Sequence, residues 1–343
     1  MFNNHLATKA GSLDIWEDII DMAEADFFER EMSGSLIDLK ELNSDWTFIN
    51  TPNFRIGDEL LAYSINAVIH DFDPYNEGII SQTKFYKLLY LLSDNLKRNG
   101  LDIKLPFYWY RYGPVIPCFI LPEEVSAVIP KSWGKAVVMG TKRSFEVSQG
   151  SREIIDDAVN SLKIQYGQSK TKKIVMDVYK LAPYEFQRKY KDFIKHLNIK
   201  ISLRNTLPSY PLKEHEDIRR LEEMIDSFEE MDFPQIYDDL LQWRLLLKNS
   251  LIKLNEVDDT YLENLSNSFW DILFCKHLQI NSQENLPLGL IKKWEKDLPR
   301  SSEDYKREFK KIEYYFYSNI YEPNKSLTKN IRAEYNECIR SLL

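Results

Sequence analysis

The sequence predicts a mainly helical protein of the α+β class, with a helical module that carries a small β-hairpin or wing and a C-terminal helical bundle. Apolar residues recur at helical spacing along most of the chain. Residues typical of strands are concentrated in two stretches between residues 105 and 149. Glycine accounts for 11 of 343 residues and charged residues for 29%, a composition typical of helix-rich chains.

Length and composition set the domain organisation. Hydrophobic residues make up 43% of the 343 residues, which is enough for the cores of two or three domains. We expect an acidic N-terminal arm over residues 1–58, a helical module over 59–205 and a helical bundle over 206–343. The bundle prediction depends on amphipathic stretches over residues 213–232, 236–254, 260–278, 302–321 and 326–343, of which 236–254 and 260–278 should pair as an antiparallel hairpin.

The net charge of −8 and the isoelectric point near 5.4 argue against general nucleic-acid binding. Three cysteines, Cys118, Cys275 and Cys338, are too far apart in sequence for a disulfide framework or a metal knuckle, which indicates a reducing compartment. The first residues lack a signal-peptide pattern, and no uncharged apolar run approaches about 18 residues. We therefore expect a cytoplasmic protein with no membrane segment.

The first 60 residues carry 13 Asp or Glu and four Lys or Arg. Trp16 lies in the most acidic part, on the apolar side of an expected amphipathic helix. This arm is either a solvated helix that lies across the main domain or a segment that covers a basic surface on a partner. In the second case Trp16 is a candidate partner contact.

The stretch from Ile79 to Pro117 is the expected centre of the module, and a helix over Glu59 to His70 precedes it. Ser81 is a suitable N-cap and Gly100 a suitable left-handed stop for the helix between them. Tyr86 and Tyr90 flank its apolar stripe, and Lys87 should face away from it. The stripe consists of Phe85, Leu88, Leu89, Leu92 and Leu96.

Residues 105–117 carry five aromatic side chains and end in Gly113-Pro114 and Pro117, so we expect a short extended segment with a fixed turn that bends back onto the helix. Strand alternation would send Trp109 and Arg111 to the face opposite Tyr108, Tyr110 and Tyr112. These side chains either pack inward or form an exposed anchor patch, because Tyr, Trp and Arg dominate binding hot spots. We take Tyr86, Tyr90, Trp109 and Arg111 as candidate partner-binding residues.

A hairpin or wing is expected over residues 135–149, around Gly140. Helices over residues 151–167 and 171–179 should follow, giving a winged-helix-like set of elements. Residues 170–204 then carry ten Lys or Arg and three acidic residues. This region either docks on the protein's own acidic arm or forms a nucleic-acid or acidic-partner face, with the candidate residues Lys170, Lys172, Lys173, Arg188, Lys189 and Lys191.

We find no sequence signature of a catalytic or metal site. The five histidines are scattered, and the chain has no HExxH, P-loop, GxSxG or GxGxxG motif. Acidic pairs such as Asp156-Asp157 lie on expected helices among other charges, as solvated faces do. The sequence thus predicts a non-enzymatic protein with no metal and no cofactor.

Four short motifs occur in order: Lys84 to Tyr90 (KFYKLLY), Tyr110 to Val115 (YRYGPV), Tyr166-Gly167 and Ala182 to Tyr184 (APY). Over about residues 59–190 the chain resembles the Panacea domain, the SocA-like antitoxin family. The resemblance implies a module that holds a toxin or effector by direct contact, with the flanking regions selecting the partner. The alternative is an accessory subunit of a prokaryotic defence or DNA-maintenance complex that contacts an ATPase subunit or nucleic acid.

Overall fold

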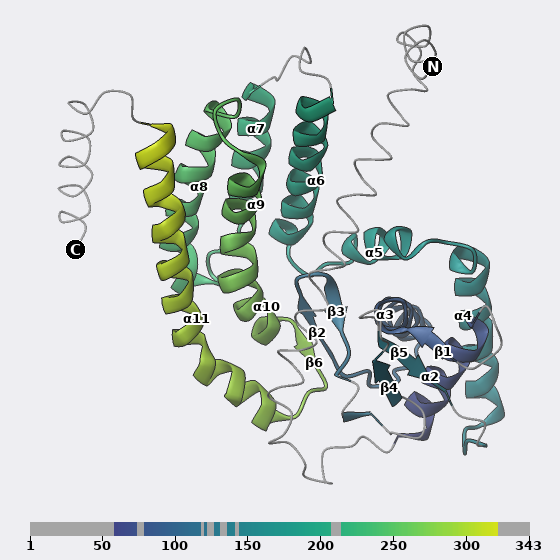
Figure 1. The fold of residues 1–343 in the computed structure, drawn as a ribbon. Coiled ribbons are helices and arrows are strands. Elements are labelled where there is room, and N and C mark those ends of the chain that lie inside the picture. Colours follow the sequence, from purple (N-terminus) through teal and green to yellow (C-terminus); the bar gives the residue numbers. More distant parts are fainter. Residues whose placement is uncertain are drawn as a thin grey trace, which may run out of the picture.

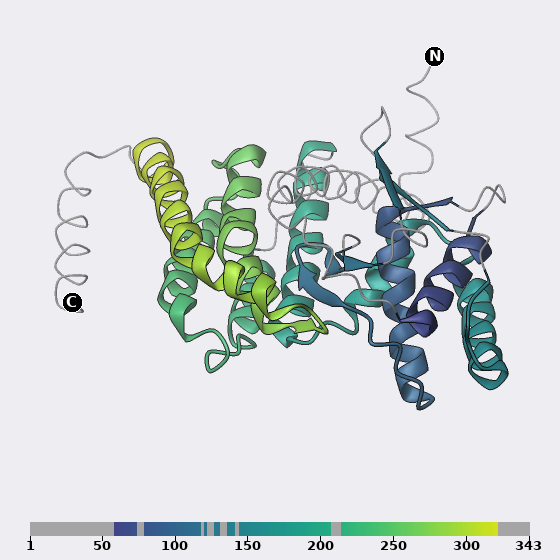
Figure 2. The same cartoon turned by 90° about the horizontal axis from the view of Figure 1, so that it is seen from below.

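The computed structural model describes residues 58–73, 79–117, 120–121, 127–130, 136–140, 144–206 and 214–321. The predicted acidic arm up to residue 57, which includes Trp16, and the predicted helix 326–343 lie outside the described residues. The described part is mainly helical with small antiparallel sheets, as the sequence predicts. Figures 1 and 2 show a smaller helix-and-strand module beside an array of longer helices.

Four helices build the module, and α3 contacts the other three. They are α2 (Glu59–Asp71), α3 (Gln82–Arg98), α4 (Gln149–Tyr166) and α5 (Thr171–Tyr179). One antiparallel sheet has the order β1-β5-β4, from β1 (Ile79–Ser81), β5 (Ala136–Met139) and β4 (Ala127–Pro130). A second has the order β3-β2-β6, from β3 (Gly113–Val115), β2 (Phe107–Tyr110) and β6 (Gln283–Glu284).

The predicted helix α3 has the expected ends and the expected buried stripe. All five stripe residues, from Phe85 to Leu96, are fully buried. Ser81 is the N-cap residue, although its side chain makes no capping hydrogen bond. Gly100 has a φ of 81°, and the Leu101 N–H donates to the Leu96 carbonyl at 2.9 Å, so the helix ends in a left-handed turn.

Lys87 was predicted to face away from the core of the module, and this is wrong. Its side chain is only 2% exposed, and its Nζ donates to the Pro114 carbonyl at 2.9 Å. The long side chain reaches this acceptor from inside, beneath the β2–β3 turn. A side chain at Gly113 would be strained, because this residue has a φ of 93°.

The aromatic segment forms an antiparallel hairpin whose turn is Arg111-Tyr112, and Gly113-Pro114 belongs to β3 rather than to the turn. Every residue of β2 is buried. One face packs on the module, where Trp109 meets Tyr179 at 5.7 Å between ring centroids. The other packs on the C-terminal half, where Tyr108 meets Trp294 at 4.9 Å. Both faces of β2 therefore pack inward, which is one of the two alternatives predicted for this segment, and β2 exposes no anchor patch.

The predicted hairpin over residues 135–149 is also wrong. β5 pairs with β4 and β1, while residues 144–148 form no strand. The Arg152 side chain explains this, because it donates to the carbonyls of Phe145 and Val147 and so satisfies acceptors that a sheet would use.

The helical array contains α6 (Glu185–Thr206), α7 (Glu214–Ile225), α8 (Tyr237–Ile252), α9 (Asp259–Asn267), α10 (Cys275–Asn281) and α11 (Leu288–Tyr315). The 3₁₀ turn η4 (Pro234–Ile236) precedes α8, the π-helix η5 (Ser268–Phe274) joins α9 to α10, and the π-helix η6 (Phe316–Ile320) follows α11. Aromatic rings fill its core, and the rings of Tyr190 and Trp270 stack at 4.0 Å. The predicted pairing of α8 with the helix that follows is confirmed by their contacts and by the Trp243 Nε1 hydrogen bond to the Leu265 carbonyl at 2.7 Å.

Two features of this array differ from the sequence prediction. α11 begins at Leu288 rather than Ser302 and continues through Pro299. α6 was placed in the module, but it stands among the bundle helices in Figure 1 and packs against α7. The domain limits themselves stay a prediction. The two parts meet where β2 packs against α10 and pairs with β6.

Truncating the α3 stripe should destabilise the protein strongly. Leu89 is fully buried, so we expect Leu89→Ala to lower the free energy of unfolding by about 2–5 kcal/mol through lost burial and a residual cavity. Urea unfolding followed by circular dichroism measures this. The control Arg98→Ala, at an exposed end of the same helix, should stay within about 0.5 kcal/mol of wild type. Equal effects of the two substitutions would contradict this orientation of α3.

Candidate binding site

The aromatic residues predicted to contact a partner mostly lie inside the fold. Tyr86 is buried and Trp109 is only 1% exposed, so neither forms an exposed anchor patch. Tyr90 is half-buried, with its ring edge-on to Phe107 and Trp109 at 5.0 and 5.6 Å. Burial raises the pKa of the Tyr90 hydroxyl to about 12. The patch is absent because both faces of the hairpin are covered by packed helices.

The predicted basic face is divided. Lys170 and Lys173 are exposed near the start of α5, whereas the side chain of Lys172 is outside the described part. The Arg188 side chain donates a hydrogen bond to the Ala182 carbonyl, so this residue stabilises the turn that precedes α6. Lys189 pairs with Glu185 at 3.0 Å and donates to the Glu223 carbonyl at 3.2 Å.

Lys191 lies among aromatic rings at the junction of the module and the bundle. Its Nζ is 5.3 Å from the ring centroid of Tyr179 and 5.6 Å from those of Tyr112 and Trp270. These distances are within the range of cation–π attraction. Burial and, to a smaller extent, the positive charge of Lys191 lower the pKa of the nearby Lys87 to about 7. Two lysine side chains therefore approach each other beneath the hairpin turn.

Arg111 connects the hairpin turn to the helical array. Its Nε lies 3.2 Å from Oδ1 of Asp271, and its guanidinium carbon lies 5.8 Å from the ring centroid of Tyr110. The Tyr179 hydroxyl donates to the Arg111 carbonyl and fixes the backbone of the turn. Both partners of the ion pair are about one-fifth exposed, so the pair is only partly accessible to water.

Two hollows meet at the Arg111–Asp271 ion pair, and Asn267 lines both. The larger is an open groove of about 670 Å³ between α9, η5 and α11, hereafter the groove. The smaller is a more enclosed pocket of about 170 Å³ between α6, α9, η5 and the hairpin turn, hereafter the pocket. The residues that line the groove include Asn264, Ser268, Ile272, Lys311, Ile312 and Tyr315.

The π-helix η5 forms the wall between the two hollows. It carries Trp270, which lines the pocket, Ile272, which lines the groove, and Asp271, which lines both. A π-helical turn inserts an extra residue into a helix, and such turns are frequent at functional sites. No motif in the sequence predicted this site, although the one acidic residue in the apolar run SFWDILF was a usable signal.

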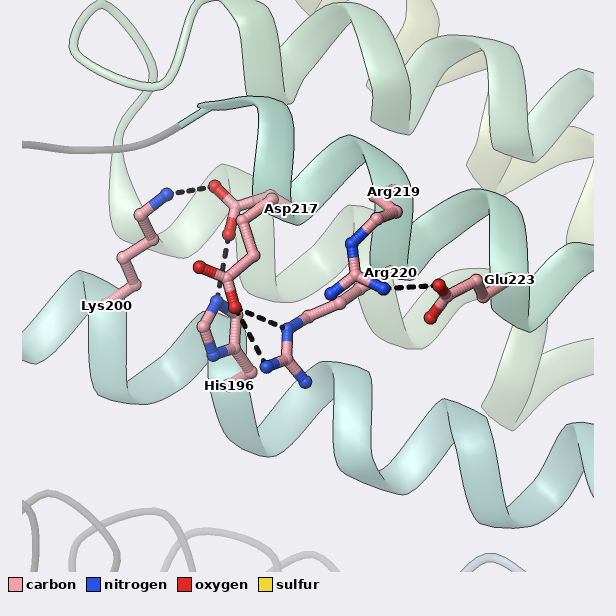
Figure 3. Close-up of polar contacts among 7 residues, drawn as sticks. His196, Lys200, Asp217, Arg219, Arg220 and Glu223 are labelled. Carbon is pink, nitrogen blue, oxygen red and sulfur yellow. Dashed lines mark hydrogen bonds and ion pairs between the residues drawn. The ribbon is translucent and has the colours of Figure 1, made fainter.

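A separate polar cluster fixes α6 to α7 (Figure 3). Asp217 is only 1% exposed; its Oδ1 lies 3.0 Å from Nε2 of His196, and its Oδ2 accepts a hydrogen bond from Lys200. His196 and Lys200 lie on α6, whereas Asp217 lies on α7, and each carboxylate oxygen of Asp217 contacts one of the two α6 side chains. This cluster therefore holds together two helices of the array, one of which carries Lys191.

Among the described residues, no group of three or more His, Cys, Asp or Glu side chains gathers where it could hold a metal ion. Burial lowers the pKa of His277 to about 4, as expected for a neutral core histidine. In the same residues, none of the helices combines the length and the apolar character needed to cross a bilayer.

The fold defines a mainly helical protein with small antiparallel sheets, in which a groove and a pocket meet at one ion pair. Comparison with protein-family models, curated proteins and solved structures finds no match to this chain. The resemblance to the Panacea family therefore stays a prediction.

Trp109→Ala should destabilise the protein by about 3–5 kcal/mol, because the ring is buried between the module and the bundle. Thermal and urea unfolding measure this loss. Wild-type stability of the variant would contradict the buried position of the hairpin.

Lys87 should make stability depend on pH in the alkaline range. Its pKa is about 7 in the folded protein and near 10.5 in the unfolded chain, so the unfolded chain binds more protons between these values. The free energy of unfolding should then rise with pH in this window, by up to about 1.4 kcal/mol per pH unit, relative to Lys87→Met. Urea titrations of both proteins at several pH values test this; parallel pH profiles would contradict it.

Proposed function

We propose that this protein is a non-enzymatic protein-binding module that receives a segment of its partner in the groove beside Arg111. The observation that carries the proposal is the open hollow of about 670 Å³ between α9, η5 and α11. A groove of this kind accommodates a peptide segment, whereas the aromatic hairpin first considered for this role is covered on both faces.

The groove combines apolar and amide side chains. Ile272, Ile312 and Tyr315 supply apolar area, and the amides of Asn264 and Asn267 can donate to and accept from a peptide backbone. The charged residues of the groove have partners within the chain, and the Asp258 carboxylate accepts a hydrogen bond from the Tyr315 hydroxyl at 2.9 Å. The Lys311 ammonium pairs with Glu308 at 2.7 Å. These properties favour a neutral, partly apolar segment over a nucleic-acid backbone.

The resemblance to the Panacea family supports the class of partner. That family's role implies a toxin or effector protein that is held and neutralised by direct contact. The flanking helical array, which forms most of the groove, is then the part that selects the partner.

Asn264→Trp tests this proposal, because Asn264 is an exposed residue of α9 that lines the groove. The matched control is Asn160→Trp, at an exposed position of α4 in the module. We expect wild type and the control to relieve toxicity when co-expressed with the product of a neighbouring gene, and to bind that product in calorimetry. Asn264→Trp should bind at least about tenfold more weakly, because a central steric block costs more than about 1.4 kcal/mol.

Equal binding by Asn264→Trp and wild type would place the partner elsewhere. Salt-sensitive DNA binding that is lost on neutralising Lys170, Lys172 and Lys173 would instead support the accessory-subunit alternative. Lys170 and Lys173 are the two predicted basic residues whose described side chains are largely exposed, so they are the informative positions.

A further inference from the structure

The enclosed pocket on the other side of the Arg111–Asp271 ion pair has the size of a small-molecule site. Its volume is about 170 Å³, comparable with an engineered cavity of about 150 Å³ that binds benzene in another protein. The lining residues come from α6, from α9 and η5, and from the β2–β3 turn. A ligand here would touch all three elements at once.

The polar part of the pocket is rich in hydrogen-bond donors. Arg111 and Lys191 bring two cationic groups to its lining. Trp270 and Ser266, which are 1% and 3% exposed, line it as well. Within the part of the chain that the structure describes, neither Nε1 of Trp270 nor Oγ of Ser266 has a hydrogen-bond partner. A buried donor without an acceptor costs about 1–3 kcal/mol, so an acceptor that reached these groups would stabilise the complex.

The lining of the pocket carries two cationic and two acidic side chains. Asp271 is already paired with Arg111, and Glu263 is an exposed residue of α9. Burial is the main cause of the lowered pKa of Lys87, and repulsion from the positive charge of Lys191 adds to it. An anion beside Lys191 would offset this repulsion, because opposite charges attract most strongly in a partly dry site.

Aliphatic side chains also line the pocket. They are Ile194, Leu197 and Ile201 from α6 and Leu262 from α9. A phosphate ion would leave this lining without contacts, whereas an apolar ring or branched chain would bury it. The pocket therefore suits a ligand with one anionic end and a compact apolar body.

We propose that the pocket binds a small organic carboxylate, with the carboxylate beside Lys191 and Arg111 and an apolar body against the α6 and α9 side chains. The ligand would bridge the hairpin turn and the helical array. Because Arg111, Asn267 and Asp271 also line the groove, its binding would change partner affinity. This last consequence depends on the function proposed above, whereas binding of the carboxylate does not.

The test uses the full chain with benzoate as probe, and with benzamide and inorganic phosphate as matched controls for charge and for the apolar body. Benzoate at about 100 times its Kd should raise the Tm by about 5 °C, and the two controls should shift it by less than about 1 °C. Equal shifts with benzoate and benzamide, or no shift with benzoate at 10 mM, would overturn the proposal.

Two variants locate the site. Lys191→Met should weaken benzoate binding in calorimetry at least tenfold, while the control Lys195→Met, one turn further along α6, should bind as wild type does. Should Lys191→Met fail to fold, Asn198→Phe, which adds bulk at a half-buried lining position, should block benzoate binding. Wild-type affinity in the folded variants would refute the site. No partner protein is needed, so failure here is distinguishable from failure of the proposed function.

Discussion

Burial of the β2–β3 hairpin between the module and the helical array is the constraint on which the rest of the structure depends. The leucine stripe of α3 is fully buried. Lys87 on the same helix donates a hydrogen bond to the Pro114 carbonyl of the hairpin. β2 pairs with β6 along one edge, and its opposite face packs against Trp294 of α11. With both faces covered, the turn at Arg111 is fixed in position against η5.

This placement creates the site. Arg111 meets Asp271 at the wall formed by a π-helical turn, and the groove and the pocket lie on either side of that ion pair. Because each hollow includes residues from the hairpin turn and from the helical array, its shape depends on how the two parts are held together. The cluster of Asp217, His196 and Lys200 restrains α6, which supplies Lys191 to the pocket.

Local patterns in the sequence were sufficient for most of the helices and for the packing of the aromatic segment against α3, but not for the start of α11. The spacing from Phe85 to Leu96 and the stop at Gly100 predicted α3 correctly. The burial of Lys87 and Trp109 could not be predicted in this way, because both depend on segments distant in the chain that cover them. The prediction of a wing over residues 135–149 was wrong for a related reason. The structure of that region depends on the pairing of β5 with the distant strand β1 and on the hydrogen bond from the Arg152 side chain to the Phe145 carbonyl. The candidate site was missed except for Arg111 and Lys191, because η5 reads as an ordinary amphipathic helix until its contacts are known.

The most direct test of this account is a double-mutant cycle between Arg111→Gln and Asp271→Asn, with the free energy of unfolding measured in urea for the four proteins. The account predicts a coupling energy of at least about 0.5 kcal/mol, because the two side chains pair where water is partly excluded. Strict additivity of the two substitutions would mean that the turn does not dock on η5, and the groove and pocket would then lose their common wall.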